Sequence, residues 1–316
     1  MSGSLIDVPG LAVGHCSLAD TGVTVVRVTD PAGAVASGEV RGVGPGTRET
    51  DLLEPYNTVE RTHAVVLSGG SAFGLAAADG VMDGLAERGI GVAPLGEEYP
   101  VRVPIVPAAV IFDLAVGAAR RPGAREGREA LENSFNNHED ARGSVGAGVA
   151  ATAGRLRGGC GQAATTVFGY TVGAAMVANP AGEVVDSLTG RFYGDPSVAS
   201  ADPARLAQLA SPDAQLNTTI GVVATDAPLT KAQARRLAMM AHDEIARAVR
   251  PAHSPWDGDT LFALSTAEQG SRPVPVATLT ALGQAAADVV AAAIVDAVVQ
   301  ADPGGELAVT AYQELQ

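Results

Sequence analysis

Short apolar segments rich in β-branched residues alternate with helical stretches along this chain, and the alternation restricts the fold to layers of sheet and helix. The segments with the length and composition of strands are 23–29, 63–67, 108–116, 165–177, 219–225, 260–265 and 307–312. Helical or glycine-rich stretches separate them. The pattern predicts an α/β fold, and 316 residues are enough for a large core in one or two domains.

Three stretches have the periodicity of amphipathic or buried helices. Segment 71–88 carries apolar residues at i, i+3 and i+4 spacing and is followed by Gly89. The clearest helix begins at Thr230, where a T-x-x-Q capping box is present, and ends before Pro251. The apolar segment 277–299 contains two aspartates, which favours a core helix over a membrane span. Between the elements, 182–217 reads as a surface linker with a short helix around 204–209.

The charge balance argues against nucleic acid and membrane partners. Lys and Arg total 21 against 35 Asp and Glu, a formal charge of -14, which repels phosphate backbones and anionic lipid surfaces. The single lysine, Lys231, follows a threonine, so no G-x-x-x-x-G-K-[ST] phosphate loop is present. The first residues lack a basic start and an apolar stretch, so we expect no signal peptide and a cytoplasmic protein.

Two glycine-rich motifs favour packing over nucleotide or ester chemistry. Segment 146–151 matches G-x-G-x-x-A, but a polar stretch precedes it where a dinucleotide site needs a strand. Segment 69–74 resembles a nucleophile elbow, but Phe73 stands where G-x-S-x-G requires glycine. We interpret the first as close glycine packing and Ser71 in the second as a helix cap.

The histidines and cysteines predict no metal site. The five histidines lie singly in unlike contexts, and His242 reads as a solvated or packed imidazole. Cys16 and Cys160 are too few for a disulfide framework and form no zinc motif, so two buried reduced thiols are expected. No cofactor is implied.

Two segments that each join a loop to a strand are the most informative, 216–225 and 254–263. An Asn217-Thr218 step at such a junction allows the threonine hydroxyl to attack the preceding carbonyl, and hydrolysis then exposes an N-terminal threonine. That residue carries its own amine as general base beside the hydroxyl. Asp257 and Asp259 could orient and stabilise the amine. From spacing alone a glycosylation sequence and an ordinary D-G-D turn remain alternatives.

These two segments, read with four others in the same order, resemble the DmpA-type aminopeptidases and the related nylon-oligomer hydrolases. The other segments are 68–74, 107–113, 143–148 and 177–182, and the resemblance covers nearly the whole chain. It implies a single αββα sandwich of the N-terminal-nucleophile type, shared with ornithine acetyltransferases. It also implies an inactive precursor that cuts itself between Asn217 and Thr218 into subunits 1–217 and 218–316, which stay together and assemble as tetramers or larger rings.

Carried over residue by residue, the resemblance makes Thr218 the nucleophile, with Asp257 and Asp259 as the carboxylates that organise it. Asn179, in Ala-Asn-Pro, matches an asparagine that holds the developing oxyanion. Arg155 stands where the nylon-oligomer hydrolases have a catalytic lysine, and it keeps the charge but cannot act as a neutral base.

Phe112 departs in a similar way, because a tyrosine is expected at this place in the substrate pocket and the phenylalanine lacks its hydroxyl donor. Together with Arg155 it speaks against activity of the nylon-oligomer type.

The resemblance favours an amidohydrolase that forms an acyl-enzyme on Thr218, and two other functions stay open. One is acyl transfer to an amine, as in ornithine acetyltransferases. The other is a non-catalytic small-molecule-binding protein. The substrate is a small peptide or amide, among short peptides with β- or D-residues, peptide amides, amino-acid esters and ω-amino-acid oligomers.

Overall fold

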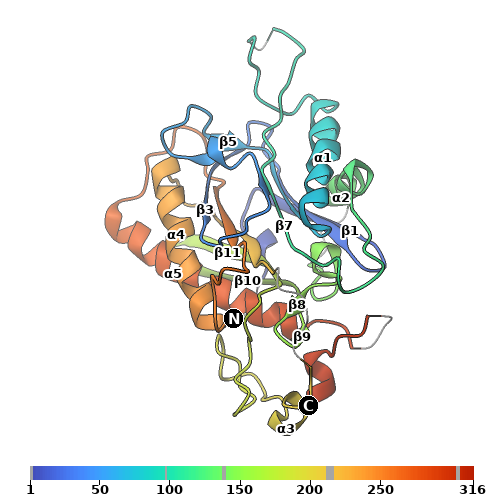
Figure 1. Ribbon diagram of the computed structural model, residues 1–316. Helices are drawn as coiled ribbons and strands as arrows, with labels where there is room; N and C mark the ends of the chain where they lie inside the picture. Colours follow the sequence, from blue (N-terminus) through green and yellow to red (C-terminus); the bar gives the residue numbers. More distant parts are fainter. Residues whose placement is uncertain (1–2, 97, 137–139, 211–216, 304–306) are drawn as a thin grey trace.

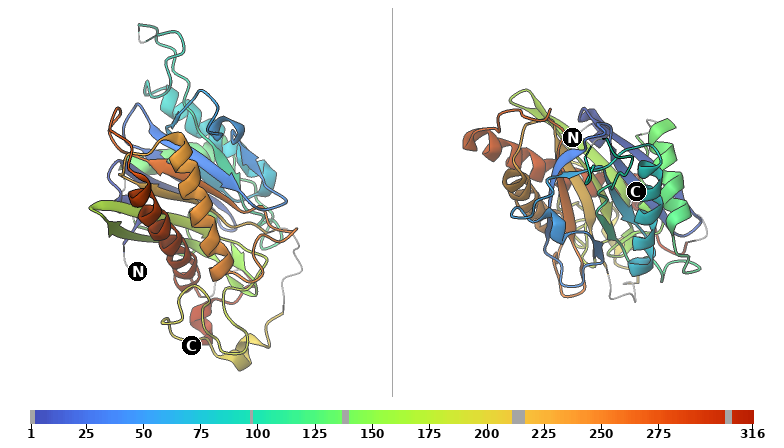
Figure 2. Two further views of the ribbon diagram at one scale, coloured as in Figure 1. Left: turned by 90° about the vertical axis from the view of Figure 1, so that its left-hand side faces the viewer. Right: turned by 90° about the horizontal axis from the view of Figure 1, so that it is seen from above.

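Two β-sheets pack face to face, and helices cover the outer side of each (Figure 1). The computed structural model describes residues 3–96, 98–136, 140–210, 217–303 and 307–316. Seen from above, the four layers run helix, sheet, sheet, helix (Figure 2). The predicted α/β fold and the αββα sandwich are both confirmed.

The first sheet has the strand order β1-β2-β6-β7-β4. Its strands are β1 Leu11–Ser17, β2 Gly22–Val28, β6 Ala64–Ser68, β7 Ala108–Val110 and β4 Thr47–Arg48. Helices α1 (Ala77–Ala86) and α2 (Ala124–Asn136) pack on its outer face through an apolar cluster that includes Val66, Val81 and Leu131.

The second sheet has the strand order β10-β11-β12-β13-β3-β5. Its strands are β10 Gly159–Val167, β11 Tyr170–Ala178, β12 Ile220–Thr225, β13 Thr260–Ser265, β3 Ala34–Val40 and β5 Arg61–Thr62. Helices α4 (Lys231–Ala248) and α5 (Val276–Val299) cover it (Figure 1). The smaller elements are β8 Thr152–Ala153, β9 Leu156–Arg157 and α3 Pro203–Leu206.

Strand alternation places the core on both faces of the second sheet. On β12, Ile220 and Val222 point into the cluster between the sheets, whereas Val223 points into the cluster under α4 and α5. Each fully buried Val or Ile contributes about 1.5–3 kcal/mol of transfer free energy. Because both faces are buried, this strand is apolar from Ile220 to Ala224. The polar residues Asn217, Thr218 and Thr219 come directly before it.

Helices α4 and α5 lie where the sequence predicted them. The Thr230 hydroxyl accepts from the Gln233 N–H at 3.1 Å and the Gln233 side chain accepts from the Thr230 N–H at 2.9 Å, which confirms the capping box. Helix α5 is long and apolar enough to cross a membrane, but 72% of its most apolar window is buried inside the molecule. It lies against α4 and the β10–β11 hairpin, where a core helix belongs.

Several sequence predictions are wrong in detail. The predicted strand 165–177 is a hairpin, because Phe168 and Gly169 at φ 52° and 81° form a two-residue turn between β10 and β11. The strand predicted over 108–116 ends at Val110. Segment 307–312 is irregular before a 3-10 helix at Tyr312–Leu315, and the Thr310 carbonyl receives its hydrogen bond from the Arg157 N–H.

The interpretations of the glycine-rich motifs are partly confirmed. Ser71 is not a cap: it lies at φ 53° at the start of a 3-10 turn, Ser71–Ala76, that precedes α1. Gly148 does pack closely, since a Cβ there would lie 2.2 Å from the Cys160 nitrogen. Cys16 and Cys160 are free and buried.

The 182–217 segment is not simply a surface linker, because Val184, Val185 and Phe192 are buried in the core beneath it.

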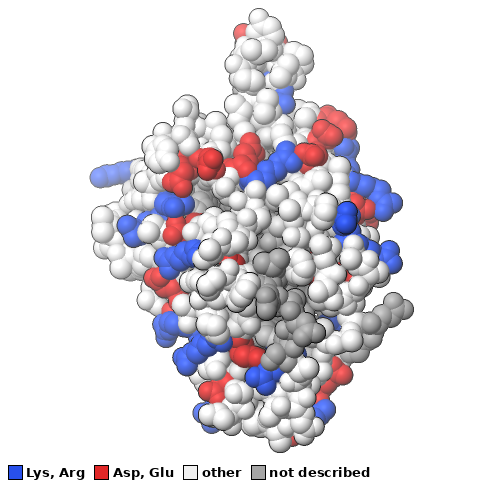
Figure 3. Space-filling model, in the orientation of Figure 1, with Lys and Arg blue, Asp and Glu red and all other residues white. Residues whose placement is uncertain are grey.

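The surface of the face seen in Figure 3 mixes acidic and basic side chains without a continuous basic area. An arm closed by a bridge between Val92 and Val103 projects from one end of the molecule (Figures 1 and 3). Leu95, Tyr99 and Val101 are exposed on it.

Candidate active site

Strand pairing brings the two informative segments together. β12 and β13 run parallel with Ile220 opposite Thr260, so the residues that precede each strand meet at the same edge of the sheet. A bridge between Asn217 and Asp257 continues the pairing beyond the strands. On the other side β11 pairs antiparallel with β12 and ends at Ala178, which places Asn179 beside Thr218. Four of the predicted site residues are thereby collected at one end of three strands.

Thr218 is buried, at 5% exposure, and its hydroxyl lies against the carbonyl group that precedes it. The Oγ1 of Thr218 donates to the Asn217 carbonyl oxygen at 2.5 Å. The same oxygen accepts the Gly258 N–H at 3.1 Å, and the Thr218 N–H donates to the Asn179 carbonyl at 2.8 Å. The hydroxyl, the peptide bond it would attack and a donor to that carbonyl are therefore in one place.

Asp257 and Asp259 are both 1% exposed and hold different parts of the site. Asp259 Oδ1 accepts the Thr219 N–H at 2.7 Å. Asp257 Oδ1 accepts the Ala181 N–H at 3.1 Å, two residues after Asn179. One carboxylate fixes the strand that carries Thr218, and the other fixes the loop that carries Asn179.

The Asn179 side chain is fully buried and oriented on both sides. Its Oδ1 accepts the Thr152 N–H at 2.8 Å, and its Nδ2 donates to the Phe112 carbonyl at 3.3 Å. The amide nitrogen has a second hydrogen that these contacts leave available. The Asn179 side chain is therefore fixed in place while one N–H of its amide remains free to donate.

A cavity of about 200 Å³ opens in front of Thr218. Its lining includes the predicted pocket residue Phe112 and the half-exposed Trp256, and the remainder is Gly44, Pro45, Gly46, Ser71, Ala72, Val110, Ile111 and Asn217. One wall is a turn that Asp113 holds by accepting the Gly70 N–H at 2.7 Å and the Thr21 hydroxyl at 2.6 Å. Burial raises the pKa of Asp113. The cavity is small, and its lining combines short side chains with the two aromatic rings of Phe112 and Trp256.

Asn179, Asp257 and Asp259 contact the segment that carries Thr218 but do not line this cavity, and neither does Arg155. Its Nε pairs with Glu183 at 2.8 Å, and its Nη1 donates to the Leu206 carbonyl at 3.5 Å. The ion pair directs the guanidinium toward the 182–206 region, behind the loop that holds Asn179. The sequence position matched a lysine of the related hydrolases, but the contacts of Arg155 are those of a structural residue.

Three groups at the site were missed from the sequence. His253 Nδ1 lies 2.7 Å from Asp259 Oδ2, the Ser254 hydroxyl donates to Asp257 Oδ2 at 2.6 Å, and the Gly258 N–H reaches the Asn217 carbonyl. His253 was judged as a metal ligand and set aside, although it lies six residues before Asp259. A serine three residues before Asp257 is a local capping pattern that could have been noticed.

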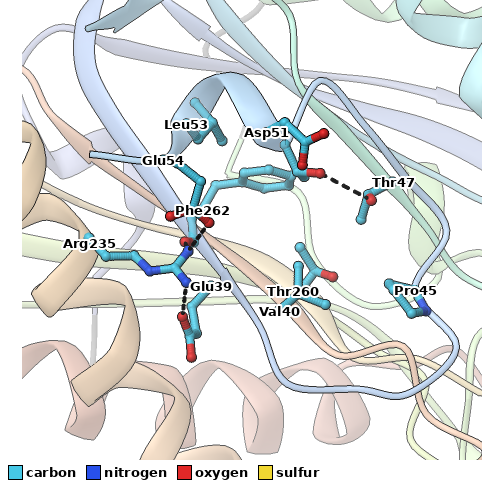
Figure 4. Close-up of a pocket in the computed structure, with 12 residues that line it drawn as sticks. Glu39, Val40, Pro45, Thr47, Asp51, Leu53, Glu54, Arg235, Thr260 and Phe262 are labelled. Carbon is cyan, nitrogen blue, oxygen red and sulfur yellow. Dashed lines mark hydrogen bonds and ion pairs between the residues drawn. The ribbon is translucent and has the colours of Figure 1, made fainter. Parts of the chain in front are cut away.

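A second cavity, of about 320 Å³, lies on the other side of the Pro45 segment. Figure 4 shows Arg235 reaching between two carboxylates, Glu39 at 2.7 Å and Glu54 at 3.5 Å. Asp51, Leu53 and Phe262 complete much of its lining. Arg235 therefore pairs with two of the three carboxylates that line this cavity.

His242 belongs to the region behind these residues. It is fully buried, and burial lowers its pKa to about 4. Its Nε2 lies 2.9 Å from the Glu39 carbonyl, so the ring is packed rather than solvated. His138 lies outside the described residues. Across the described part of the chain, no group of three or more His, Cys, Asp or Glu is gathered as a metal site requires.

Comparison with known proteins identifies close sequence relatives. The model of "Peptidase family S58" matches residues 3–307. An uncharacterised aminopeptidase of Mycobacterium leprae is 46% identical, over 95% of this chain and 91% of that protein. The 6-aminohexanoate-oligomer endohydrolase of Paenarthrobacter ureafaciens is 30% identical, over 92% of this chain and 84% of that protein.

Solved structures share the fold at lower identity. A Burkholderia sp. beta-aminopeptidase superposes with a TM-score of 0.78 at 24% identity, over 98% of this chain and 89% of that one. An L-aminopeptidase D-Ala-esterase/amidase of Ochrobactrum anthropi, described as a variant of the Ntn hydrolase fold, gives a TM-score of 0.78 at 22% identity. It covers 99% of this chain and 92% of its own.

Proposed function

We propose that this chain, which belongs to peptidase family S58 and is a hydrolase of amide bonds, becomes active by cutting its own peptide bond between Asn217 and Thr218. The observation that carries the proposal is the contact of the Thr218 hydroxyl with the Asn217 carbonyl at 2.5 Å in a buried site. A threonine that merely begins a strand has no need of this arrangement.

The self-cleavage step is an N-to-O acyl shift followed by hydrolysis. The Thr218 Oγ1 forms a bond to the Asn217 carbonyl carbon, the C–N bond breaks, and the proton of the hydroxyl passes to the Thr218 nitrogen. Water then cleaves the resulting ester, which leaves a carboxylate on Asn217 and a free amine and hydroxyl on Thr218. The Gly258 N–H, at 3.1 Å from the Asn217 oxygen, supports the negative charge that develops there.

In the cleaved protein the same hydroxyl attacks a substrate amide. The new α-amine takes the hydroxyl proton and returns it to the leaving amine, so that no separate base is needed. Asp259, held on the neighbouring Thr219 N–H, orients the segment and stabilises the protonated amine. The spare Asn179 N–H is the donor for the oxyanion, a contribution of about 3 kcal/mol to the barrier.

The cavity supports a small substrate. A volume of about 200 Å³ beside Thr218 holds one short acyl group rather than an extended peptide. The names of the relatives, aminopeptidase and 6-aminohexanoate-oligomer endohydrolase, are consistent with amides of this kind. We expect small aminoacyl amides to be cleaved, and ω-amino-acid oligomers less readily, because Phe112 in the cavity lacks the hydroxyl that the resemblance leads us to expect there.

Denaturing electrophoresis and intact mass test the proposal. Purified protein should resolve into fragments of 217 and 99 residues, and Thr218→Ala should stay as one uncut, inactive chain. Incubation of the cleaved protein with a small amide and hydroxylamine separates hydrolysis from acyl transfer, because a transferase yields the hydroxamate in preference to the acid. A parent protein that stays intact and shows the same behaviour as Thr218→Ala contradicts the proposal and favours a binding role.

A further inference from the structure

The turn before the two aspartates is built to hold their carboxylates. His253 lies at φ 53°, a left-handed conformation that residues other than glycine rarely adopt. In this conformation both its backbone N–H and its Nδ1 face Asp259 Oδ2, at 3.2 Å and 2.7 Å. Strain of this kind persists only where surrounding contacts impose it.

The next residue makes the same arrangement with the other aspartate. The Ser254 N–H and hydroxyl both donate to Asp257 Oδ2, at 2.9 Å and 2.6 Å. The remaining oxygen of each carboxylate accepts a backbone N–H, from Thr219 for Asp259 and from Ala181 for Asp257. His253 and Ser254 therefore hold one carboxylate each. Of the two carboxylates, Asp259 is the one that also accepts the N–H of Thr219, the residue after Thr218.

The hydrogen bonds define how the His253 ring acts. A carboxylate can only accept, so Nδ1 carries the hydrogen. The Nε2 of His253 is buried and has no hydrogen-bond partner among the described residues. The nearest ring is His242 on α4, with centroids 5.3 Å apart, and its Nε2–H donates to the Glu39 carbonyl. The Nδ1–H of His253 thus orients Asp259 through one of its carboxylate oxygens.

We propose that His253 is a positioning residue for the Thr218 nucleophile. Its imidazole fixes the orientation of the Asp259 carboxylate. Asp259 in turn holds the Thr219 N–H, and this contact fixes the position of the adjoining Thr218. The Asp259 carboxylate, oriented in this way, is available to the protonated amine of Thr218. This inference rests on the proposed function, because it requires Thr218 to be the nucleophile.

Replacement of His253 tests the inference. His253→Ala should lower kcat about 10- to 100-fold on a small amino-acid p-nitroanilide, by analogy with the loss of outer partners of metal ligands, while KM changes less than about threefold. His253→Asn, whose amide N–H can take the place of Nδ1–H, should recover most of kcat. The acid limb of the kcat profile should move to lower pH in His253→Ala, because a protonated Thr218 amine that loses an oriented carboxylate gives up its proton more readily.

A matched control separates positioning from folding. His63→Asn removes another buried imidazole, whose Nδ1 accepts the Ile105 N–H at 3.0 Å, and asparagine retains an acceptor there. It should leave kcat and its pH profile unchanged, and thermal unfolding of every variant measures stability separately.

Three results are distinguishable. If the parent cleaves itself and His253→Ala has the parent's kcat and acid limb, the inference is wrong and the proposed function stands. If His253→Asn loses as much as His253→Ala, or both lose activity only in proportion to folded protein, His253 has a structural role alone. If the parent does not cut between Asn217 and Thr218, the proposed function fails first.

Discussion

The Asn217–Thr218 junction and the cavity at Arg235 both lie beside buried carboxylates, but the partners of these carboxylates differ. Asp257 and Asp259 accept only neutral backbone N–H groups, the Ser254 hydroxyl and the His253 ring among the described residues. Glu39, in contrast, pairs with Arg235 at 2.7 Å (Figure 4), and it also pairs with Arg41 at 3.5 Å.

The difference separates a chemical role from a structural one. A carboxylate paired with arginine has its charge balanced, and its contribution is to the stability of the fold. A carboxylate held by backbone N–H groups, a hydroxyl and an imidazole is oriented without an arginine beside it, and it stays available to a cation that arrives or forms nearby. The Arg235 cavity is the larger of the two, but the Thr218 region is the better candidate for the active site because its carboxylates are not paired with arginine.

The largest difference is expected when one carboxylate is neutralised beside Thr218 and one beside Arg235. Asp259→Asn should lower kcat/KM about 100-fold or more and slow self-cleavage, because the organising charge is lost and an amide cannot accept all three donors. Glu39→Gln should change kcat/KM less than about threefold. Steady-state kinetics and the rate of fragment appearance measure both, and equal losses in the two variants contradict the assignment.

The pH dependence of stability tests whether His242, the ring next to His253, stays neutral in the folded protein. Burial lowers the pKa of His242 to about 4 from an ordinary value of 6.5. The unfolded chain therefore binds a proton first as the pH falls, and stability is lost between about pH 6.5 and 4. From pH 7 to 5 the loss from this ring is about 2 kcal/mol.

Urea unfolding of the parent and of His242→Gln at the two pH values checks this, because the variant should lose less stability between them. The burial that lowers the pKa of His15 and His63 to about 4 gives both proteins a common background loss. Identical losses in parent and variant would show that His242 does not remain neutral in the folded protein.

Removal of the arginine tests the structural side of the comparison. Arg235→Ala leaves Glu39 with Arg41 alone and removes the contact of the guanidinium with the Gly38 carbonyl, so we expect a loss of about 1–2 kcal/mol in unfolding free energy. Activity of the folded fraction should stay within about threefold of the parent. A large loss of kcat without a change in the urea midpoint would place Arg235 in the catalytic site instead.

The smallest effect is expected where the Thr218 cavity gains a polar group. Phe112→Tyr adds a hydroxyl to the lining, and one neutral hydrogen bond of about 0.5–1.5 kcal/mol corresponds to at most about a tenfold rise in kcat/KM. A comparison of 6-aminohexanoate oligomers with small aminoacyl amides measures the change for each class. A fall for both classes means that the apolar ring itself is required.

The elements that the sequence predicted well are those whose signal is local. The Thr230 capping box and the apolar core of α5 depend on residues within a few turns of one another, and the structure reproduces both. Strands β12 and β13 are apolar on both faces and lie where expected. The β10–β11 hairpin was read as one strand, since its turn uses Phe168 rather than the usual asparagine or aspartate.

The site divides in the same way. The residue types at Thr218, Asp257 and Asp259, and their places before strands, were visible in the sequence and in its resemblance to known hydrolases. His253 was not, because its role depends on a left-handed turn and on a contact to Asp259. Arg155 was placed at the site by resemblance, and its ion pair with Glu183 directs it elsewhere.

The sequence by itself determined the layered fold, the helices α1, α4 and α5 and the junctions at which polar residues meet buried strands, because those features follow from periodicity and local hydrogen bonding. Only the tertiary structure decided that Asn179 and Asp259 contact the segment that carries Thr218 and that Arg235 lines a separate cavity. The reason is that strand register and side-chain pairing join residues 40 or more positions apart, and no local pattern records such a pairing.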